Sequence, residues 1–183
     1  MSSDPRRFNI PLIALHWLTL LLIALAYATD QLREAFEHTP TEGLLTHWHS
    51  VFGVTVLGAT AFRLVVRAFT RAPAIVPAPP RWQEVLAALT HAALYGLMIA
   101  LPLTGWLMFN ADGKAVVWFG TQLPTLLGPS KGLAKALKEV HEAIATAGYF
   151  LIGMHAAAAL FHHYVVRDNT LRLMWPGLRP RAP

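Results

Sequence analysis

The sequence predicts an all-α integral membrane protein, a single antiparallel four-helix bundle over residues 1–183. Three observations predict it. Of the 183 residues, 55% are hydrophobic and only 14% are charged, a balance far from that of a soluble domain. Four long apolar runs are each long enough to cross a bilayer. Nine histidines and no cysteine leave imidazole to do the chemistry, and exclude disulfides, thiolate metal sites and iron–sulfur clusters.

Uncharged runs predict the first two spans. Residues 8–29 form the first, with Pro11 in the first helical turn, where proline is tolerated. A helix of this length rises about 33 Å, enough for a bilayer, and the run is too long for the core of a signal peptide. After a short polar loop, residues 43–67 form the second span, which ends with Arg63 and Arg67.

Irregular segments flank the third span. Residues 71–81 contain four prolines and are predicted to be a stiff connection. Residues 82–111 form the third span, with a kink expected at Pro102. Residues 115–130 are apolar but interrupted by glycine and proline, so we expect an interfacial loop or a short helix there. Residues 137–166 form the fourth span.

Basic residues predict the orientation, because cytoplasmic helix ends carry an excess of Lys and Arg. The side that holds both termini has ten of them: Arg6, Arg7, Arg63, Arg67, Arg71, Arg81, Arg167, Arg172, Arg179 and Arg181. The opposite side has five: Arg33, Lys114, Lys131, Lys135 and Lys138. We therefore expect both termini in the cytoplasm. Because the charges lie at the ends of spans, they indicate contact with lipid and no nucleic acid.

Two histidines lie fourteen residues apart on the fourth span. At about 100° and 1.5 Å per residue, His155 returns to within roughly 40° of the face that carries His141, about 21 Å further along the axis. Alanines and glycines surround both positions, which lets a helix or a flat macrocycle approach closely. One helix face therefore presents two imidazoles at two depths.

The first and second spans carry a partner histidine at each depth. His16 lies about 12 Å from the cytoplasmic edge of its span and His155 about 17 Å from the same edge, so the two can meet. His49 and His141 both lie near the outer ends of their spans. A haem held by two histidines needs imidazoles on opposite faces of the porphyrin. We therefore predict two haem b groups in the bundle core, held by the pairs His16/His155 and His49/His141.

Histidines in membrane helices also serve other roles. A lone membrane histidine is often hydrogen-bonded to a neighbour or part of a proton relay, and the four matched depths are what favour haem. Two histidines without a carboxylate or a cysteine make an incomplete site for zinc or non-haem iron. His47 competes with His49, but Gly53 lies one turn below His49 and would clear space for a ring, so we choose His49.

The remaining polar residues suggest secondary sites. His162 lies on nearly the same face as His155, about 10 Å nearer the cytoplasm, and is placed to hydrogen-bond a quinone; a snorkelling interfacial histidine is an equal alternative. His91 is predicted to approach His162. His163 is expected to face lipid headgroups, and His38 to lie in a loop. On the outer side, basic residues would steer small anions, although each is more simply a solvated loop residue: Lys114, Lys131, Lys135, Lys138 and Arg33.

These residues resemble the bacterial cytochrome b561 family, and within it the superoxide oxidases. The resemblance runs through residues 14–18, 49–53 and 91–102, and most specifically through 140–173, with Phe161-His162-His163-Tyr164 and Asp168-Asn169-Thr170-Leu171. It implies that the chain lies in the bacterial inner membrane and that the haem ligands are His16, His49, His141 and His155. It also implies that periplasmic superoxide reduces the outer haem, and that ubiquinone is reduced to ubiquinol near the cytoplasmic side, with His162 matching a residue of its site. His47 and residues 112–130 depart from the pattern.

The leading expectation is an oxidoreductase. Bis-histidine haems have no open iron site for oxygen, so the expected chemistry is outer-sphere electron transfer. One alternative is a non-catalytic dihaem subunit that relays electrons between a periplasmic dehydrogenase and the quinone pool, with residues 115–127 as its docking patch. Another is a histidine-lined transporter without a redox role. The sequence alone does not identify a protein partner.

Overall fold

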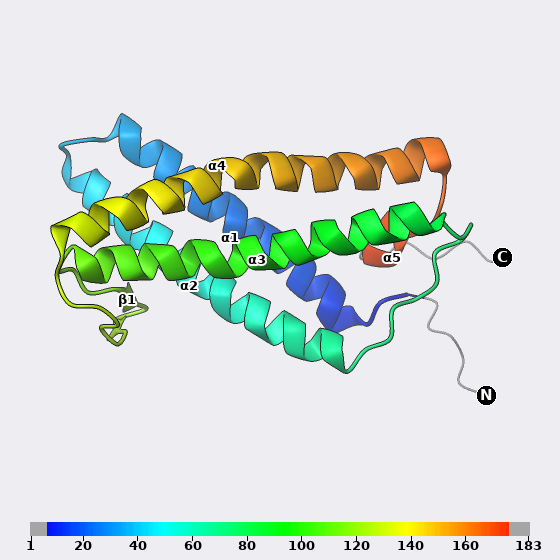
Figure 1. Ribbon diagram of the computed structural model, residues 1–183, viewed down its shortest axis with the longest axis horizontal. Coiled ribbons are helices and arrows are strands. Elements are labelled where there is room, and N and C mark those ends of the chain that lie inside the picture. Colours follow the sequence, from blue (N-terminus) through cyan, green and yellow to red (C-terminus); the bar gives the residue numbers. More distant parts are fainter. Residues whose placement is uncertain (1–6, 176–183) are drawn as a thin grey trace.

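The computed structural model describes residues 7–175 and is built on four long helices (Figure 1). They are α1 (Ile10–Ala35), α2 (Pro40–Ala68), α3 (Arg81–Ala111) and α4 (Lys131–Phe161). Successive helices run in opposite directions, and each is long and apolar enough to cross a membrane, so the structure has four candidate spans, as the sequence predicts. Three residues used to predict the orientation lie outside the described residues: Arg6, Arg179 and Arg181.

The helices extend beyond the apolar runs. Helix α4 begins at Lys131 rather than near residue 137, because Ser130 caps it and the polar residues that follow continue the helix outside the apolar segment. Helix α1 continues to Ala35 rather than ending near residue 29. Its added turn carries an ion pair between Arg33 and Asp30, with the nitrogen and oxygen 3.2 Å apart.

A hairpin lies between α3 and α4, where we expected a loop or a short helix. Strands β1 (Val117–Trp118) and β2 (Thr121–Gln122) pair antiparallel around a two-residue turn. Phe119 has a φ of 45° there, a conformation that is strained for a bulky residue. The buried side chain of Asn110 holds the loop after the hairpin, because its Oδ1 accepts the backbone N–H of Leu126 at 2.7 Å.

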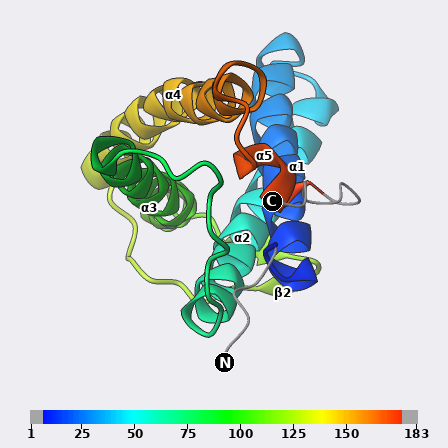
Figure 2. The ribbon, with the colours of Figure 1, turned by 90° about the vertical axis from the view of Figure 1, so that its right-hand side faces the viewer.

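The other end of the bundle is closed by the C-terminal segment. A π-helical turn, η1 (His162–Val166), follows α4 and leads to a short helix, α5 (Thr170–Met174). The Trp17 indole of α1 donates to the carbonyl of Met174 at 2.7 Å, so α5 lies across this end beside α1 (Figure 2). Asn169 ties the same segment to the proline-rich connection.

The helix backbones pack in neighbouring pairs, and side chains link α4 to α1. The close backbone approaches are between α1 and α2, α3 and α4, and α2 and α3. Helix α4 reaches α1 through Tyr27, whose hydroxyl donates to the carbonyl of Ala145 at 2.8 Å and whose ring lies 4.3 Å from that of Tyr149. Aromatic side chains therefore bridge the wider gap between α1 and α4.

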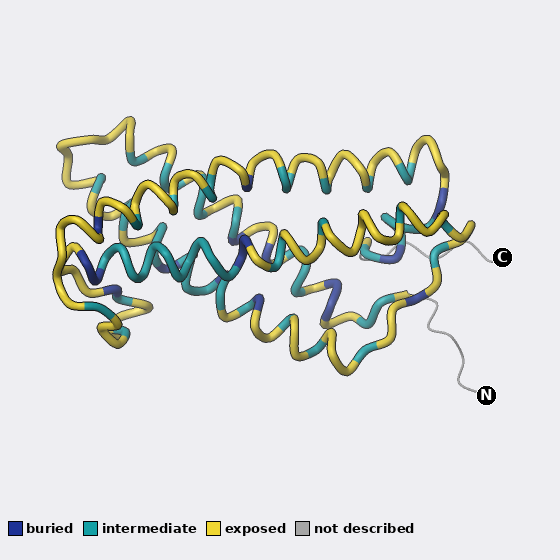
Figure 3. The backbone as a smooth tube through the Cα atoms, viewed as in Figure 1, coloured by how far each residue is buried: buried dark blue, intermediate teal, exposed yellow. Residues whose placement is uncertain are grey.

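A small apolar cluster occupies the middle of the bundle. Its members are Leu22, Val56, Leu97 and Met98, one or two from each of the first three helices. Outward faces of the spans remain exposed and apolar (Figure 3), as Phe150 shows with 75% of its surface accessible. Such faces are suited to lipid, because a bilayer replaces the water that would otherwise disfavour them.

Candidate functional site

The bundle brings the four predicted histidines together as two pairs. His49 of α2 and His141 of α4 have ring centroids 6.2 Å apart and planes at 72°. We call them the hairpin-end pair. His16 of α1 and His155 of α4 have centroids 6.3 Å apart and planes at 73°, and we call them the α5-end pair. The two pairs lie toward opposite ends of α4, with the apolar cluster between them.

The spacing of both pairs fits two imidazoles on one metal ion. A metal–imidazole bond of about 2 Å places rings on opposite sides of an ion with centroids about 6.2–6.4 Å apart. Both observed distances fall within this range, and the near-perpendicular planes are compatible with it because each plane can contain the common axis. Among the described residues, no cluster of three or more His, Cys, Asp or Glu side chains forms a conventional metal site. A macrocycle that supplies four further nitrogens therefore suits the donor set.

Hydrogen bonds to the Nδ1 atoms orient both rings of the hairpin-end pair. His49 Nδ1 lies 2.9 Å from the carbonyl oxygen of Ala26, and His141 Nδ1 lies 3.1 Å from the hydroxyl of Thr104. The carbonyl can only accept, so His49 carries its proton on Nδ1 and keeps Nε2 as a free ligand atom. Gly105 provides space, since a Cβ there would lie 3.2 Å from His141 Cε1. Ligands of haem iron are held in this way.

The α5-end pair has a third histidine beside it. We predicted that His91 would approach His162, but its ring packs against that of His155, with centroids 5.4 Å apart. The rotation of α3 decides this contact, and the sequence does not fix that rotation. The 5.4 Å spacing is too short for two rings on opposite sides of one ion, whereas the spacing between His16 and His155 is suitable.

Arg63 places a positive charge near the α5-end pair. Its guanidinium lies 5.7 Å from the ring centre of Tyr95, and it is close enough to His16 and His155 to act on both electrostatically. Its buried Nε has no hydrogen-bond partner among residues 7–175, and no carboxylate there pairs with it. A cation without a carboxylate partner inside a membrane protein is suited to bind an anionic group of a cofactor. Haem carries two carboxylates and is such a cofactor.

His162 and its neighbours lie at the end of α4. Its Nδ1 is 2.6 Å from Oδ2 of Asp168, a contact that sequence reasoning missed because it depends on the π-helical turn. His163 is partly buried against Tyr164, with ring centroids 4.8 Å apart. His47, the competitor of His49, is exposed and contacts Trp48.

Most of the basic residues expected to steer anions are paired with carboxylates. Lys114 lies 2.7 Å from Asp112, and the hydrogen bond between them lowers the pKa of that carboxyl. Lys135 and Lys138 pair with acidic residues one helical turn further on, at 3.9 and 3.6 Å. These pairs are exposed and locally neutral, so the positive potential that they give this end is weaker than the count of lysines suggests.

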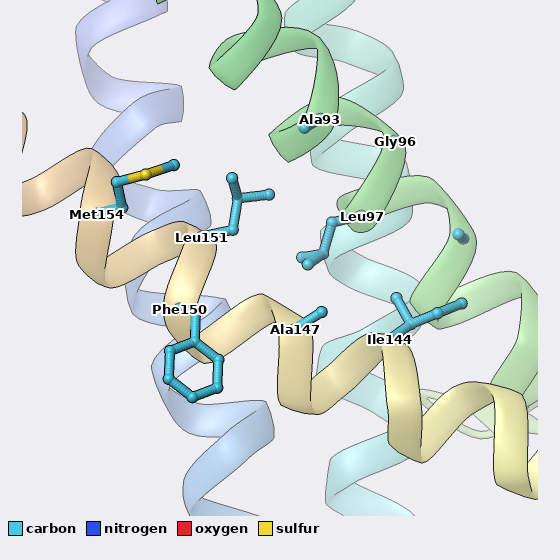
Figure 4. A pocket seen from close by; sticks show the side chains of 9 residues that line it. Ala93, Gly96, Leu97, Ile144, Ala147, Phe150, Leu151 and Met154 are labelled. Atoms are coloured by element: carbon cyan, nitrogen blue, oxygen red, sulfur yellow. The ribbon is translucent and has the colours of Figure 1, made fainter.

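An apolar groove of about 560 Å³ lies between α3 and α4, and no histidine is among its lining residues (Figure 4). Its walls include Gly96, Leu97, Ala147 and Phe150, and none of its lining side chains titrates. A lining of this kind has the character of a lipid-facing seam.

Comparison with known proteins identifies the family of the chain. The family model described as prokaryotic cytochrome b561 matches residues 7–177. Cytochrome b561 homolog 1 of Escherichia coli K12 is 40% identical over 173 residues, which cover 93% of this chain and 97% of that protein. The probable superoxide oxidase CybB of Yersinia pestis is 34% identical over 95% of this chain and 98% of its own length. Cytochrome b561 homolog 2 of E. coli K12 is 26% identical over 94% of this chain. The chain belongs to the prokaryotic cytochrome b561 family, whose members bind haem b and transfer electrons, and it is a multi-pass bacterial membrane protein.

Proposed function

We propose that the chain binds two haem b groups, one at the hairpin-end pair and one at the α5-end pair. The observation that carries this is the equal spacing of the two histidine pairs, 6.2 and 6.3 Å, at two depths of one bundle. We further propose that the chain lies in the inner membrane with both termini in the cytoplasm. The hairpin then faces the periplasm, and α5 faces the cytoplasm.

The proposed activity is superoxide:ubiquinone oxidoreduction. Two superoxide ions lose one electron each at the hairpin end, and ubiquinone takes up two electrons and two protons at the α5 end, giving two oxygen molecules and ubiquinol. Haem b held by a pair of these histidines would supply outer-sphere electron transfer. The likeness to a probable superoxide oxidase over 95% of the chain supports this choice of substrate.

The side chains of this chain take distinct parts in that reaction. His49, His141, His16 and His155 hold the two groups at fixed depths. Arg63 pairs with a carboxylate of the haem that the α5-end pair holds. His162, at the end of α4, hydrogen-bonds the quinone, and His91 beside His155 is a second contact for it. The lysines at the hairpin end add a modest attraction for an anionic substrate.

A superoxide pulse tests the proposed activity. The purified protein is mixed with superoxide at low salt in the presence of a water-soluble ubiquinone, and haem absorbance and ubiquinol are followed together. We expect rapid haem reduction and then ubiquinol at one molecule per two superoxide ions. Haem that stays oxidised throughout would contradict the assignment of superoxide as donor.

The hairpin favours a second candidate function, relay of electrons from a periplasmic dehydrogenase. Phe119 is 64% exposed and Trp118 is 37% exposed, and both belong to the hairpin beside Trp48. An aromatic surface of this kind suits a protein partner. The same pulse separates the two functions, because a relay subunit would leave superoxide unused.

A further inference from the structure

The end of α4 folds back on itself so that Asp168 meets His162. Helix α4 widens into the π-helical turn, and Arg167 then takes a left-handed conformation with a φ of 62°. The N–H of Asp168 donates to the carbonyl of His162 at 3.2 Å, while its carboxylate reaches His162 Nδ1 at 2.6 Å. His162 and Asp168 are thus joined by both a main-chain and a side-chain hydrogen bond. A π-helical turn followed by a non-glycine residue at positive φ is a costly arrangement that is typical of functional sites.

The carboxylate of Asp168 is buried, and its environment defines its partners. Its side chain is 1% exposed, whereas that of His162 is 22% exposed. Oδ1 accepts the N–H of Thr170 at 2.8 Å, and Oδ2 faces His162. A buried carboxylate is costly unless it is hydrogen-bonded, and 2.6 Å is the length of a charge-assisted bond. The acceptor oxygen fixes the proton of His162 on Nδ1 and leaves Nε2 for an external partner.

Other charged groups lie around this pair. A polar pocket of about 240 Å³ adjoins Asp168 and is lined by His163, Tyr164, Arg167 and Arg172. The two guanidinium groups disfavour a further positive charge nearby. The carboxylate of Asp168 is the opposite charge in this cluster, and it faces His162 directly at 2.6 Å. Asp168 itself is among the lining residues, so the pocket lies directly against its pair with His162.

We propose that Asp168 is a positioning residue that holds His162 as the proton donor for quinone reduction, an inference that rests on the proposed function. As the quinone takes up two electrons, the Nε2–H bond of the His162 imidazolium breaks and an O–H bond forms at the nearer carbonyl oxygen. The second proton comes from water at the other carbonyl, and His162 recovers its proton from water when the quinol leaves. Asp168 stays ionised throughout, as the orienting carboxylate does in other His–Asp pairs.

The kinetic test starts from haem that has been reduced chemically, so superoxide plays no part in it. Reduced protein is mixed with ubiquinone-1 and haem re-oxidation is followed between pH 5.5 and 9. In Asp168→Asn, the amide keeps one oxygen for Thr170 but turns its NH₂ toward Nδ1, so Nδ1 can no longer carry a proton and the imidazolium proposed as the donor is disfavoured. We expect re-oxidation to slow about tenfold or more at neutral pH, and its fall with rising pH to begin at lower pH.

Asn169→Ala is the matched control. It removes hydrogen bonds of Asn169 to Val76 and Ala74 at 2.9 and 3.2 Å, loosening the same corner without touching the His–Asp pair. It should leave the pH profile unchanged. Asp168→Glu, which keeps a carboxylate, should recover part of the rate. His162→Gln should be slow, and adding Asp168→Asn to it should change little, because the two residues act as a unit.

A second readout needs no quinone. In protein labelled with ¹⁵N-histidine, the Nδ1–H proton of His162, identified by its loss in His162→Gln, should disappear in Asp168→Asn. If Asp168→Asn keeps that proton and the wild-type rate and pH profile, the role of Asp168 is contradicted while the proposed function stands. Equal slowing of Asp168→Asn and Asn169→Ala with unchanged pH profiles also contradicts it, because that outcome marks a structural role. Wild-type protein that ubiquinone-1 fails to re-oxidise contradicts the quinone half of the proposed function, and this inference with it.

Discussion

The two histidine pairs are alike in spacing but differ in what lies behind the rings. At the hairpin-end pair, the Ala26 carbonyl and the Thr104 hydroxyl hold the two Nδ1 atoms, and the rings are oriented by neutral backbone and side-chain groups. At the α5-end pair, the neighbours are His91 and the guanidinium of Arg63. The comparison indicates that hydrogen bonds orient the rings of the hairpin-end pair, whereas a nearby positive charge acts on the rings of the α5-end pair. The charged site lies nearer the end where proton uptake is proposed.

Removing a ligand should have the largest effect and should act on one pair at a time. We expect His49→Ala to lose the haem of the hairpin-end pair, and His155→Ala to lose that of the α5-end pair, so that each variant keeps about half of the wild-type haem. Haem-to-protein ratios and reduced-minus-oxidised spectra measure this. His47→Ala is the control and should keep the full content. Full haem content in either ligand variant would exclude that residue as a ligand.

Removing the support behind a ligand should affect only the hairpin-end pair. Thr104→Val deletes the hydroxyl that meets His141 Nδ1 at 3.1 Å. Loss of such a partner weakens metal binding by about 10- to 100-fold, which haem dissociation to apomyoglobin would report. Thr60→Val is the control, because the buried Thr60 hydroxyl has no hydrogen-bond partner in the described chain. Equal haem loss in both variants would mean that Thr104 acts through packing alone.

Removing the charge should affect only the α5-end pair. Arg63→Gln takes away a cation that favours the reduced haem, so we expect the potential of that haem to fall by on the order of 1 kcal/mol, or about 40 mV. A redox titration resolves the two haems. Arg67→Gln, one turn further along α2, should shift it less, because the Arg67 guanidinium donates to the carbonyl of Thr70 at 2.9 Å. A shift confined to the other haem would reverse the assignment.

Surface charge should have the smallest effect. Lys135→Gln with Lys138→Gln should slow haem reduction by superoxide less than about threefold at low salt, since both lysines are paired and exposed. The reverse change, Glu139→Gln with Glu142→Gln, should raise the rate by a similar factor. Stopped-flow rates at two ionic strengths measure both. A tenfold loss that persists at high salt would show a direct contact between these lysines and superoxide.

Hydropathy and helix rise were sufficient to predict the four spans and the depths of the histidines. The contacts depend on quantities that the sequence hides. The rotation of α3 decides that His91 meets His155, and the π-helical turn decides that Asp168 meets His162. The hairpin was missed because its turn uses Phe119 at positive φ, where asparagine or glycine is the usual signal.

The number of haems per chain tests the central claim most directly. We predict that the purified wild-type protein contains two haem b groups per polypeptide, both with the low-spin spectrum of bis-histidine coordination and neither binding carbon monoxide when reduced. A ratio of one haem per chain, or a reduced haem that binds carbon monoxide, would contradict the assignment of the two pairs.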